Sequence, residues 1–90
     1  MAYNIEYDDN AIKQLKKIDK SQRDIILKWI KKNLNNSENP RETGKKLKGN
    51  LKDYWRYRVG KYRIITEIND EHITIIVINI GHKSDGYKNK

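Results

Sequence analysis

In the N-terminal third of the chain, hydrophobic residues first recur at every second position and then at every third or fourth position. Residues 3–7, YNIEY, alternate apolar or aromatic side chains with polar ones, which predicts a short, half-buried strand. Asp8 or Asp9 can then cap a helix whose apolar positions are spaced to share one face. These positions are Ala11, Ile12, Leu15 and Ile18.

A second helix is predicted after a short connection. Ser21 with Asp24 three residues later resembles a capping box, which predicts that the helix begins near Ser21. Because the connection is short, the two helices are expected to pair as an antiparallel hairpin. The apolar stripe of the second helix is Ile25, Ile26, Trp29 and Ile30, with Leu34 at its end.

The C-terminal half is predicted to be a loop followed by β-structure. Residues 35–44, NNSENPRETG, have the composition of a loop, and 45–52 form a basic segment with Leu47 and Leu51 as its expected apolar contacts. Three further strands are predicted at 54–59, 62–68 and 73–80. The last of these strands has apolar residues at both odd and even positions, which is typical of an interior strand covered on both faces.

Together these elements predict an α+β fold in a single domain, residues 1–90. An N-terminal strand and an antiparallel helical hairpin precede a three-stranded antiparallel meander. The expected arrangement packs both helices on one face of a mostly antiparallel sheet. The pattern leaves open what covers the other face.

The hairpin YWRYRVGKYR, residues 54–63, concentrates positive charge across two paired strands. A two-residue loop starting at Gly60 suits a type II′ turn and places Arg58 opposite Arg63. Alternation then puts these two arginines and Arg56 on one face, with the aromatic and aliphatic residues on the other. An opposed pair of like charges costs a few tenths to ~1 kcal/mol, so removal of Arg63 is expected to leave the fold intact.

The charge distribution favours a polyanionic or acidic partner. The net charge is +8, and residues 41–63 carry nine basic residues against two acidic ones. Three of the five arginines lie in the hairpin, where a planar guanidinium suits bidentate contact with phosphate. The alternative is a solvated edge strand whose charge blocks aggregation. The lysines expected to face RNA or the ribosome are Lys45, Lys46, Lys48, Lys52 and Lys61.

The sequence indicates neither a cofactor nor a membrane segment. It contains no cysteine, and His72 and His82 lack the spacing of paired metal ligands. The N-terminus does not have the pattern of a signal peptide, and no apolar run approaches the ~20 residues that span a bilayer. We therefore expect a cytoplasmic protein without a metal or small-molecule cofactor.

The segment LKGNLKDYWRYRVGKYRIITEI, followed by a hydrophobic strand and IGHKSDGY, resembles the RelE/ParE superfamily of type II toxin–antitoxin toxins. The resemblance extends over nearly the whole chain, from the N-terminal strand to the C-terminal tail. It implies a small sheet-and-helix toxin that is neutralised by an acidic antitoxin. In the RelE branch it implies metal-independent cleavage of mRNA in the ribosomal A site.

The resemblance also implies roles for five residues. Arg56 and Arg58 match two basic positions, one near the attacking 2′-OH and one at the phosphate. Arg63 matches the arginine that stabilises the charged phosphorane of the transition state. Lys83 stands where the family more often has arginine, and Tyr87 matches a tyrosine that stacks on a base and assists proton transfer.

His82 is a further candidate, because its reference pKa lies near neutrality and suits a general acid or base. The alternative is an ordinary polar residue at the end of a strand. Two other functions also stay open: a ParE-like toxin that poisons DNA gyrase without cleaving nucleic acid, and an inactive basic module of an autoregulating complex. The arginine triplet together with Tyr87 is the feature that a nuclease needs and a gyrase poison does not.

Overall fold

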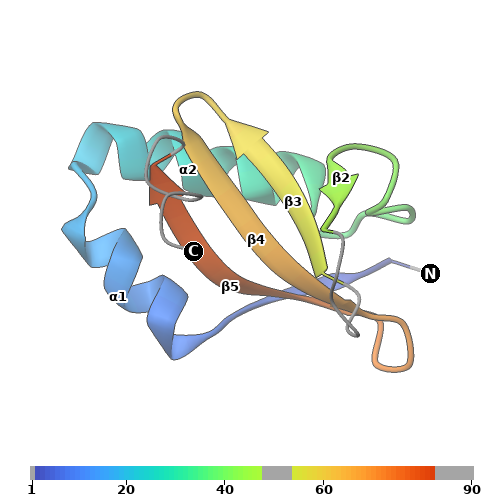
Figure 1. Cartoon of the computed structure of the whole chain (residues 1–90). Helices are drawn as coiled ribbons and strands as arrows, with labels where there is room; N and C mark the ends of the chain where they lie inside the picture. The colour runs from blue at the N-terminus through green and yellow to red at the C-terminus, as the bar shows by residue number, and fades with distance from the viewer. Residues whose placement is uncertain (1, 48–53, 83–90) are drawn as a thin grey trace.

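The computed structural model describes residues 2–47 and 54–82, which form two helices and a five-stranded sheet (Figure 1). In chain order the elements are β1 (Asn4–Tyr7), α1 (Asp9–Lys17), α2 (Lys20–Asn33), β2 (Lys45–Lys46), β3 (Tyr54–Val59), β4 (Tyr62–Asn69) and β5 (Thr74–His82). The predicted α+β class and the order of helices and strands are confirmed. Neither of the two described helices is long and apolar enough to cross a membrane.

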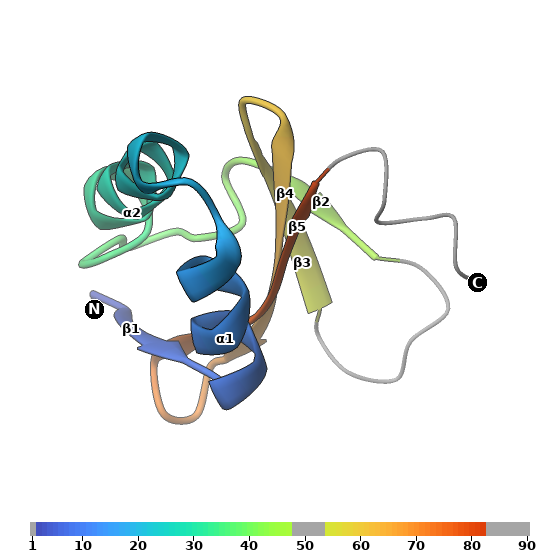
Figure 2. The same cartoon turned by 90° about the vertical axis from the view of Figure 1, so that its left-hand side faces the viewer.

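The sheet is mixed, with the strand order β1-β5-β4-β3-β2. β1 runs parallel to β5, and the other neighbouring strands are antiparallel. The predicted meander is therefore β3-β4-β5, and β5 is the predicted interior strand between β1 and β4. The short edge strand β2 lies within residues that the sequence assigned only to a basic segment. Figure 2 shows both helices on one face of the sheet, as predicted.

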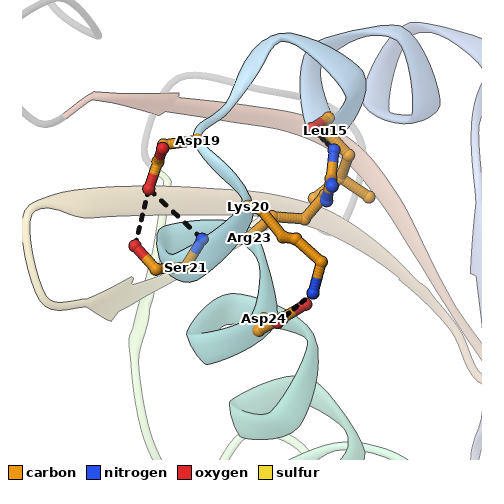
Figure 3. Close-up of polar contacts among 6 residues, drawn as sticks. All are labelled: Leu15, Asp19, Lys20, Ser21, Arg23 and Asp24. Atoms are coloured by element: carbon orange, nitrogen blue, oxygen red, sulfur yellow. Dashed lines mark hydrogen bonds and ion pairs between the residues drawn. The ribbon is translucent and has the colours of Figure 1, made fainter.

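The two helices make their main contacts with the sheet, α1 with β5 and α2 with β3. The predicted helical hairpin is an open one, because the sheet supplies more contact to each helix than the other helix does. Its corner is bridged by Arg23, whose Nη1 donates a hydrogen bond to the carbonyl oxygen of Leu15 at 3.4 Å (Figure 3).

The start of α2 differs from the predicted capping box. Asp19 is the N-cap, and its carboxylate accepts hydrogen bonds from the backbone N and the Oγ of Ser21, at 3.2 and 2.6 Å (Figure 3). Asp24 instead forms an exposed ion pair with Lys20 at 3.3 Å. The hydrogen bonds from Ser21 lower the pKa of Asp19. The prediction was wrong because the acceptor that satisfies the helix start lies two residues before Ser21.

The core lies between the helices and the sheet. Two stripe residues predicted to be buried, Ile12 and Ile25, are 39% and 52% exposed, because the face of each helix that contacts the sheet is narrower than its apolar stripe. Trp29 and Trp55 are partly buried at the rim of the core. The buried core residues are Ala11, Leu15, Ile26, Ile30, Leu34, Tyr57, Val59, Ile64, Ile75, Val77 and Ile80.

Side chains of α1 continue the edge of the sheet where β1 ends. β1 pairs with residues 74–77 of β5. Beyond this, Asn10 Nδ2 donates to the carbonyl oxygen of Ile78 at 3.0 Å, and Gln14 Oε1 accepts from the backbone N of Ile80 at 2.6 Å. These amides satisfy backbone groups that a longer β1 would otherwise pair. The helix therefore fixes both the face and the edge of β5.

Candidate nucleic-acid interface

The arginine hairpin has the predicted register. Arg58 lies opposite Arg63, Arg56 opposite Ile65, and the turn begins at Gly60, whose φ is +60°. The next residue does not have a positive φ, and a single positive φ at the first loop position fits the type II′ turn expected from the sequence. The turn matches the twist of the strands and fixes which side chains share a face.

Four cations lie together on the face of the sheet opposite the helices. Their neighbours along β3 and β4, such as Tyr57 and Ile64, are buried in the core, so alternating residues point away from it. Lys45 of β2 lies directly opposite Arg56 and therefore shares its face. We call this surface the cationic face; it consists of Lys45, Arg56, Arg58 and Arg63.

The three arginines differ in burial. Arg63 is only 6% exposed, Arg56 is half-buried, and Arg58 is exposed. The burial of Arg63 overturns the basis for expecting that its removal would leave the fold intact, because truncation also removes packed atoms. A guanidinium keeps its positive charge in proteins, so the cationic face combines a fixed interior charge with an accessible one.

Other predicted site residues lie elsewhere. Lys46 is opposite Trp55, which packs against the core, and so belongs to the helix-facing side. Lys61 is exposed at the hairpin turn. His82 is opposite Tyr62, with ring centroids 5.5 Å apart in an edge-on contact. Tyr62 also packs against the core, so the sheet separates His82 from the cationic face. Outside the described residues lie Lys48, Leu51, Lys52, Lys83 and Tyr87.

The positive charge of Arg41 is paired with a carboxylate of the same chain. Its guanidinium contacts both carboxylate oxygens of Asp70, at 3.2 and 3.1 Å, and Tyr3 Oη donates to the same carboxylate at 2.6 Å. The hydrogen bond from Tyr3, followed by that from Arg41, lowers the pKa of Asp70. These contacts join the loop after α2 to the turn between β4 and β5. Arg41 therefore contributes to the fold rather than to the cationic face.

A pocket of about 280 Å³ lies at the edge of β3, next to β2. It is lined by Trp29, Thr43, Gly44, Lys45, Arg56, Tyr57 and Arg58. Sequence reasoning missed this pocket because it assigned Trp29 to the core and the Thr43-Gly44 segment to an ordinary loop. No local pattern marks it, because the pocket forms where the loop folds back against a strand that follows it in the sequence.

Hydrogen bonds from side chains of β3 to backbone carbonyl groups hold the loop wall of the pocket against this strand. Trp55 Nε1 donates to the carbonyl oxygen of Thr43 at 2.6 Å, and Tyr57 Oη donates to that of Pro40 at 2.5 Å. Gly44 has a φ of +78°, and a Cβ at this position would collide with the carbonyl oxygen of Arg56. The loop therefore approaches β3 at a distance that glycine permits and alanine does not.

The described residues contain no group of three or more His, Asp or Glu side chains that could hold a metal ion. Two features define what the site can do. The cationic face presents guanidinium groups across neighbouring strands, which suits phosphate groups. The adjacent pocket adds an aromatic wall. The fold and the site thus define a small, basic α+β protein with a cationic sheet face.

Known proteins share this fold and sequence. The family described as "ParE toxin of type II toxin-antitoxin system, parDE" matches residues 5–87. The mRNA interferase toxin RelE of Escherichia coli is 30% identical over 92% of this chain and 85% of its own length. Toxin RelG of Mycobacterium tuberculosis is 27% identical over 98% of this chain and 99% of its own length.

A solved structure shows the same architecture. The toxin–antitoxin complex RelBE2 of Mycobacterium tuberculosis contains a chain with a TM-score of 0.80 and 26% identity, covering 91% of this chain and 99% of that one. The chain described here belongs to the RelE/ParE superfamily and is a toxin of the type II toxin–antitoxin class.

Proposed function

We propose that this toxin is an endoribonuclease, a metal-independent and ribosome-dependent mRNA interferase that inhibits translation. The observation that carries the proposal is the cationic face, on which Arg56, Arg58 and Arg63 lie together on adjacent strands. The alignment with the mRNA interferase toxin RelE over most of both chains supports the same activity.

Cleavage by the 2′-OH of RNA forms a bond between the 2′-oxygen and phosphorus and breaks the bond to the 5′-oxygen. The site must assist loss of the 2′-OH proton, stabilise the phosphorane and supply a proton to the leaving oxygen. Arg63 is proposed to stabilise the phosphorane, because a buried, fixed charge acts strongly where water is excluded. Arg56 and Arg58 are proposed to hold the phosphate and to favour the ionised 2′-oxygen.

Proton transfer is assigned to residues of the C-terminal tail. Tyr87 is proposed to stack on a base and to assist proton transfer, and Lys83 to assist the leaving group. His82 lies across the sheet from the three arginines, so it could reach the scissile phosphate only around the end of the sheet. We therefore place it outside the reacting centre. Lys45 and Lys61 are proposed to contact RNA or the ribosome at the periphery.

The proposed partner is a cognate acidic antitoxin. Toxins of this family have been crystallised with RelB antitoxins, from Mycobacterium tuberculosis and from Escherichia coli. A net charge of +8 makes an acidic partner electrostatically favourable. In its absence the toxin is expected to arrest growth when expressed.

Primer extension on a reporter mRNA, after pulsed expression in a translating lysate, tests the activity. Discrete cuts within translated codons are expected for the parent chain and for Lys46→Ala, which removes a charge on the helix-facing side. Arg58→Ala should lose most of the cuts. Equal cutting by Lys46→Ala and Arg58→Ala, with both proteins folded, would contradict the assignment of the cationic face.

The ParE description of the matching family favours one second candidate, a poison of DNA gyrase. Pulsed expression of the toxin in growing cells, with the reporter mRNA and DNA replication both followed, distinguishes it. Intact mRNA, together with stalled replication and trapped gyrase–DNA complexes, would select the gyrase poison and reject the nuclease. Cuts in the reporter without any effect on supercoiling would do the reverse.

A further inference from the structure

Strand β5 contains a β-bulge close to its C-terminal end. The pairing of β4 with β5 skips Ile78, which shifts the alternation of side chains by one residue. Val77 before the bulge and Ile80 after it therefore both lie in the core. Gly81 follows on the other side of the sheet, directly opposite Arg63. The bulge thus places a residue without a side chain on the same side of the sheet as the cationic face.

Side chains of α1 hold the backbone of β5 around this bulge. Asn10 Nδ2 donates to the carbonyl oxygen of Ile78 at 3.0 Å, and Gln14 Oε1 accepts from the backbone N of Ile80 at 2.6 Å. Bulges are common next to active sites, where they change the face on which a residue lies. Because the helix fixes the backbone at the bulge, it also fixes the position of Gly81 relative to β4.

The usual structural reasons for a glycine do not apply at position 81. Its φ is not positive, so other residues can adopt the same backbone conformation. Among the described residues, only Asn79 Oδ1 would lie within 4 Å of a Cβ at this position, at 3.7 Å. The Arg63 side chain therefore does not occupy the space above Gly81. A glycine inside a strand otherwise indicates that a ligand or another backbone approaches closely.

This space lies at the end of a row of residues that crosses three strands. β3, β4 and β5 are neighbours in the sheet (Figure 1). Arg58, Arg63 and Gly81 are paired in register across them. The Cβ atoms of directly opposed residues lie about 4.5–5.5 Å apart, so a side chain at position 81 would project beside Arg63. Since Arg63 is only 6% exposed, the size of its neighbours controls how closely a ligand can approach it.

We propose that Gly81 leaves a notch beside Arg63 that seats one sugar–phosphate unit of single-stranded RNA. The inference deepens the proposed function and rests on it. The guanidinium groups of the row suit a phosphate, and the missing side chain leaves room for a ribose. A position that offers space but no hydrogen-bonding side chain contacts the repeating backbone and does not read a base. Residue 81 is therefore a determinant of how closely RNA approaches Arg63.

The probe is a fluorescent, short single-stranded RNA, and its binding to the full chain is measured by anisotropy. Gly81→Val should weaken binding about 10- to 100-fold, the scale of losing one hydrogen bond to a charged group. Gly81→Ala should weaken it less, because its side chain is smaller. Asn4→Val is the control: it adds a valine without changing the charge, at an exposed position opposite Thr74 at the other end of β5. It should bind RNA as the parent does.

Thermal melts separate the loss of RNA binding from a loss of folding. Gly81→Val should melt no lower than the parent, because valine favours a strand and the space is open. A much lower melting temperature would overturn the inference by showing that the chain itself fills the space, as would parent-like RNA affinity in folded Gly81→Val. Reporter cuts by Gly81→Val at the parent level refute the notch alone. Graded loss of RNA affinity, with no cuts by the parent, refutes the nuclease alone.

Discussion

Two arginines that face each other across the hairpin have different surroundings. Arg58 is exposed and is free to meet a ligand from solvent, whereas Arg63 is almost wholly buried beneath the same face. Burial reduces the motion of the Arg63 guanidinium and the dielectric around it, and both effects strengthen its interaction with a developing negative charge. At the residue scale, the cationic face therefore contains one arginine, Arg58, that is suited to binding a ligand from solvent. It contains another, Arg63, that is suited to stabilising a charged transition state.

The first prediction concerns Arg63. Arg63→Ala should slow single-turnover cleavage on programmed ribosomes by roughly 10²–10³-fold, the scale of removing one preorganised donor. Arg63→Lys should recover part of the rate, because it keeps the charge but not the planar fork. Thermal melts control for folding, since Arg63 is buried and its truncation removes packing. Cleavage by folded Arg63→Ala at the parent rate would rule out a transition-state role.

At the element scale, the loop between α2 and β3 determines the shape of the site. Its wall is held by backbone acceptors at Pro40 and Thr43 and by the close approach of Gly44 to β3. Between these two acceptors, Arg41 joins the loop to the β4–β5 turn through Asp70. The loop can thus be perturbed at either place with different consequences for the pocket.

The three described glycines give a graded test of this loop. Gly44→Ala imposes both a positive φ and a collision, Gly60→Ala imposes a positive φ alone, and Gly81→Ala imposes neither, because its nearest neighbour is 3.7 Å away. Gly60→Ala should cost ~1–2 kcal/mol and Gly44→Ala more, with Gly81→Ala close to the parent. Melting temperatures should follow that order. A Gly44→Ala protein as stable as Gly81→Ala would contradict the close approach.

The Asp70 cluster predicts a dependence of stability on pH. The pKa of folded Asp70 is lowered from the ordinary value of 3.8, first by the hydrogen bond from Tyr3 and second by that from Arg41. A lowered folded pKa stabilises the protein above the unfolded pKa, and this contribution is lost as pH falls through the folded pKa. The stability lost in Asp70→Asn should therefore be largest near neutrality and shrink in acid, as measured by urea unfolding.

Asp24→Asn is the matched control for that experiment, because it removes the carboxylate of an exposed ion pair within one helix. Such pairs contribute little to stability, so this variant should stay close to the parent at every pH. An Asp70→Asn deficit that is the same in acid as at neutrality would show that the carboxylate is not stabilised as its contacts indicate.

The elements themselves were predictable where local pattern decides them. The register of the hairpin follows from a glycine in a two-residue turn, and β5 follows from apolar residues at both odd and even positions. The start of α2 was misplaced because Asp19 and Ser21 are both good caps, and the choice depends on the chain direction entering the helix. The burial of Arg63 and the position of His82 depend on packing and on pairing over long sequence distances, which periodicity does not report.

At the scale of the whole molecule, the four cations of the cationic face lie on one face of the sheet. The helices cover the other face (Figure 2). Two like-charged pairs, Lys45 with Arg56 and Arg58 with Arg63, lie directly opposed across neighbouring strands. Like charges opposed in this way destabilise a sheet, and the net charge of +8 adds to the repulsion. An anionic ligand, whether RNA or an acidic protein, is expected to weaken this repulsion.

This arrangement predicts opposite effects of one substitution on the free and the bound protein. Arg58→Gln should stabilise the free fold by a few tenths to ~1 kcal/mol, because it removes the exposed member of the pair with Arg63. A gain of that size raises the melting temperature by at most about 4–8 °C in a domain of this length. A single-stranded RNA should raise the melting temperature of the parent, because it binds the folded state, and should raise that of Arg58→Gln much less. Lys46→Gln removes an equal charge from the other side of the sheet and should keep the full response to RNA. If Arg58→Gln melts below the parent and still responds fully to RNA, Arg58 stabilises the fold and is not a site for anions.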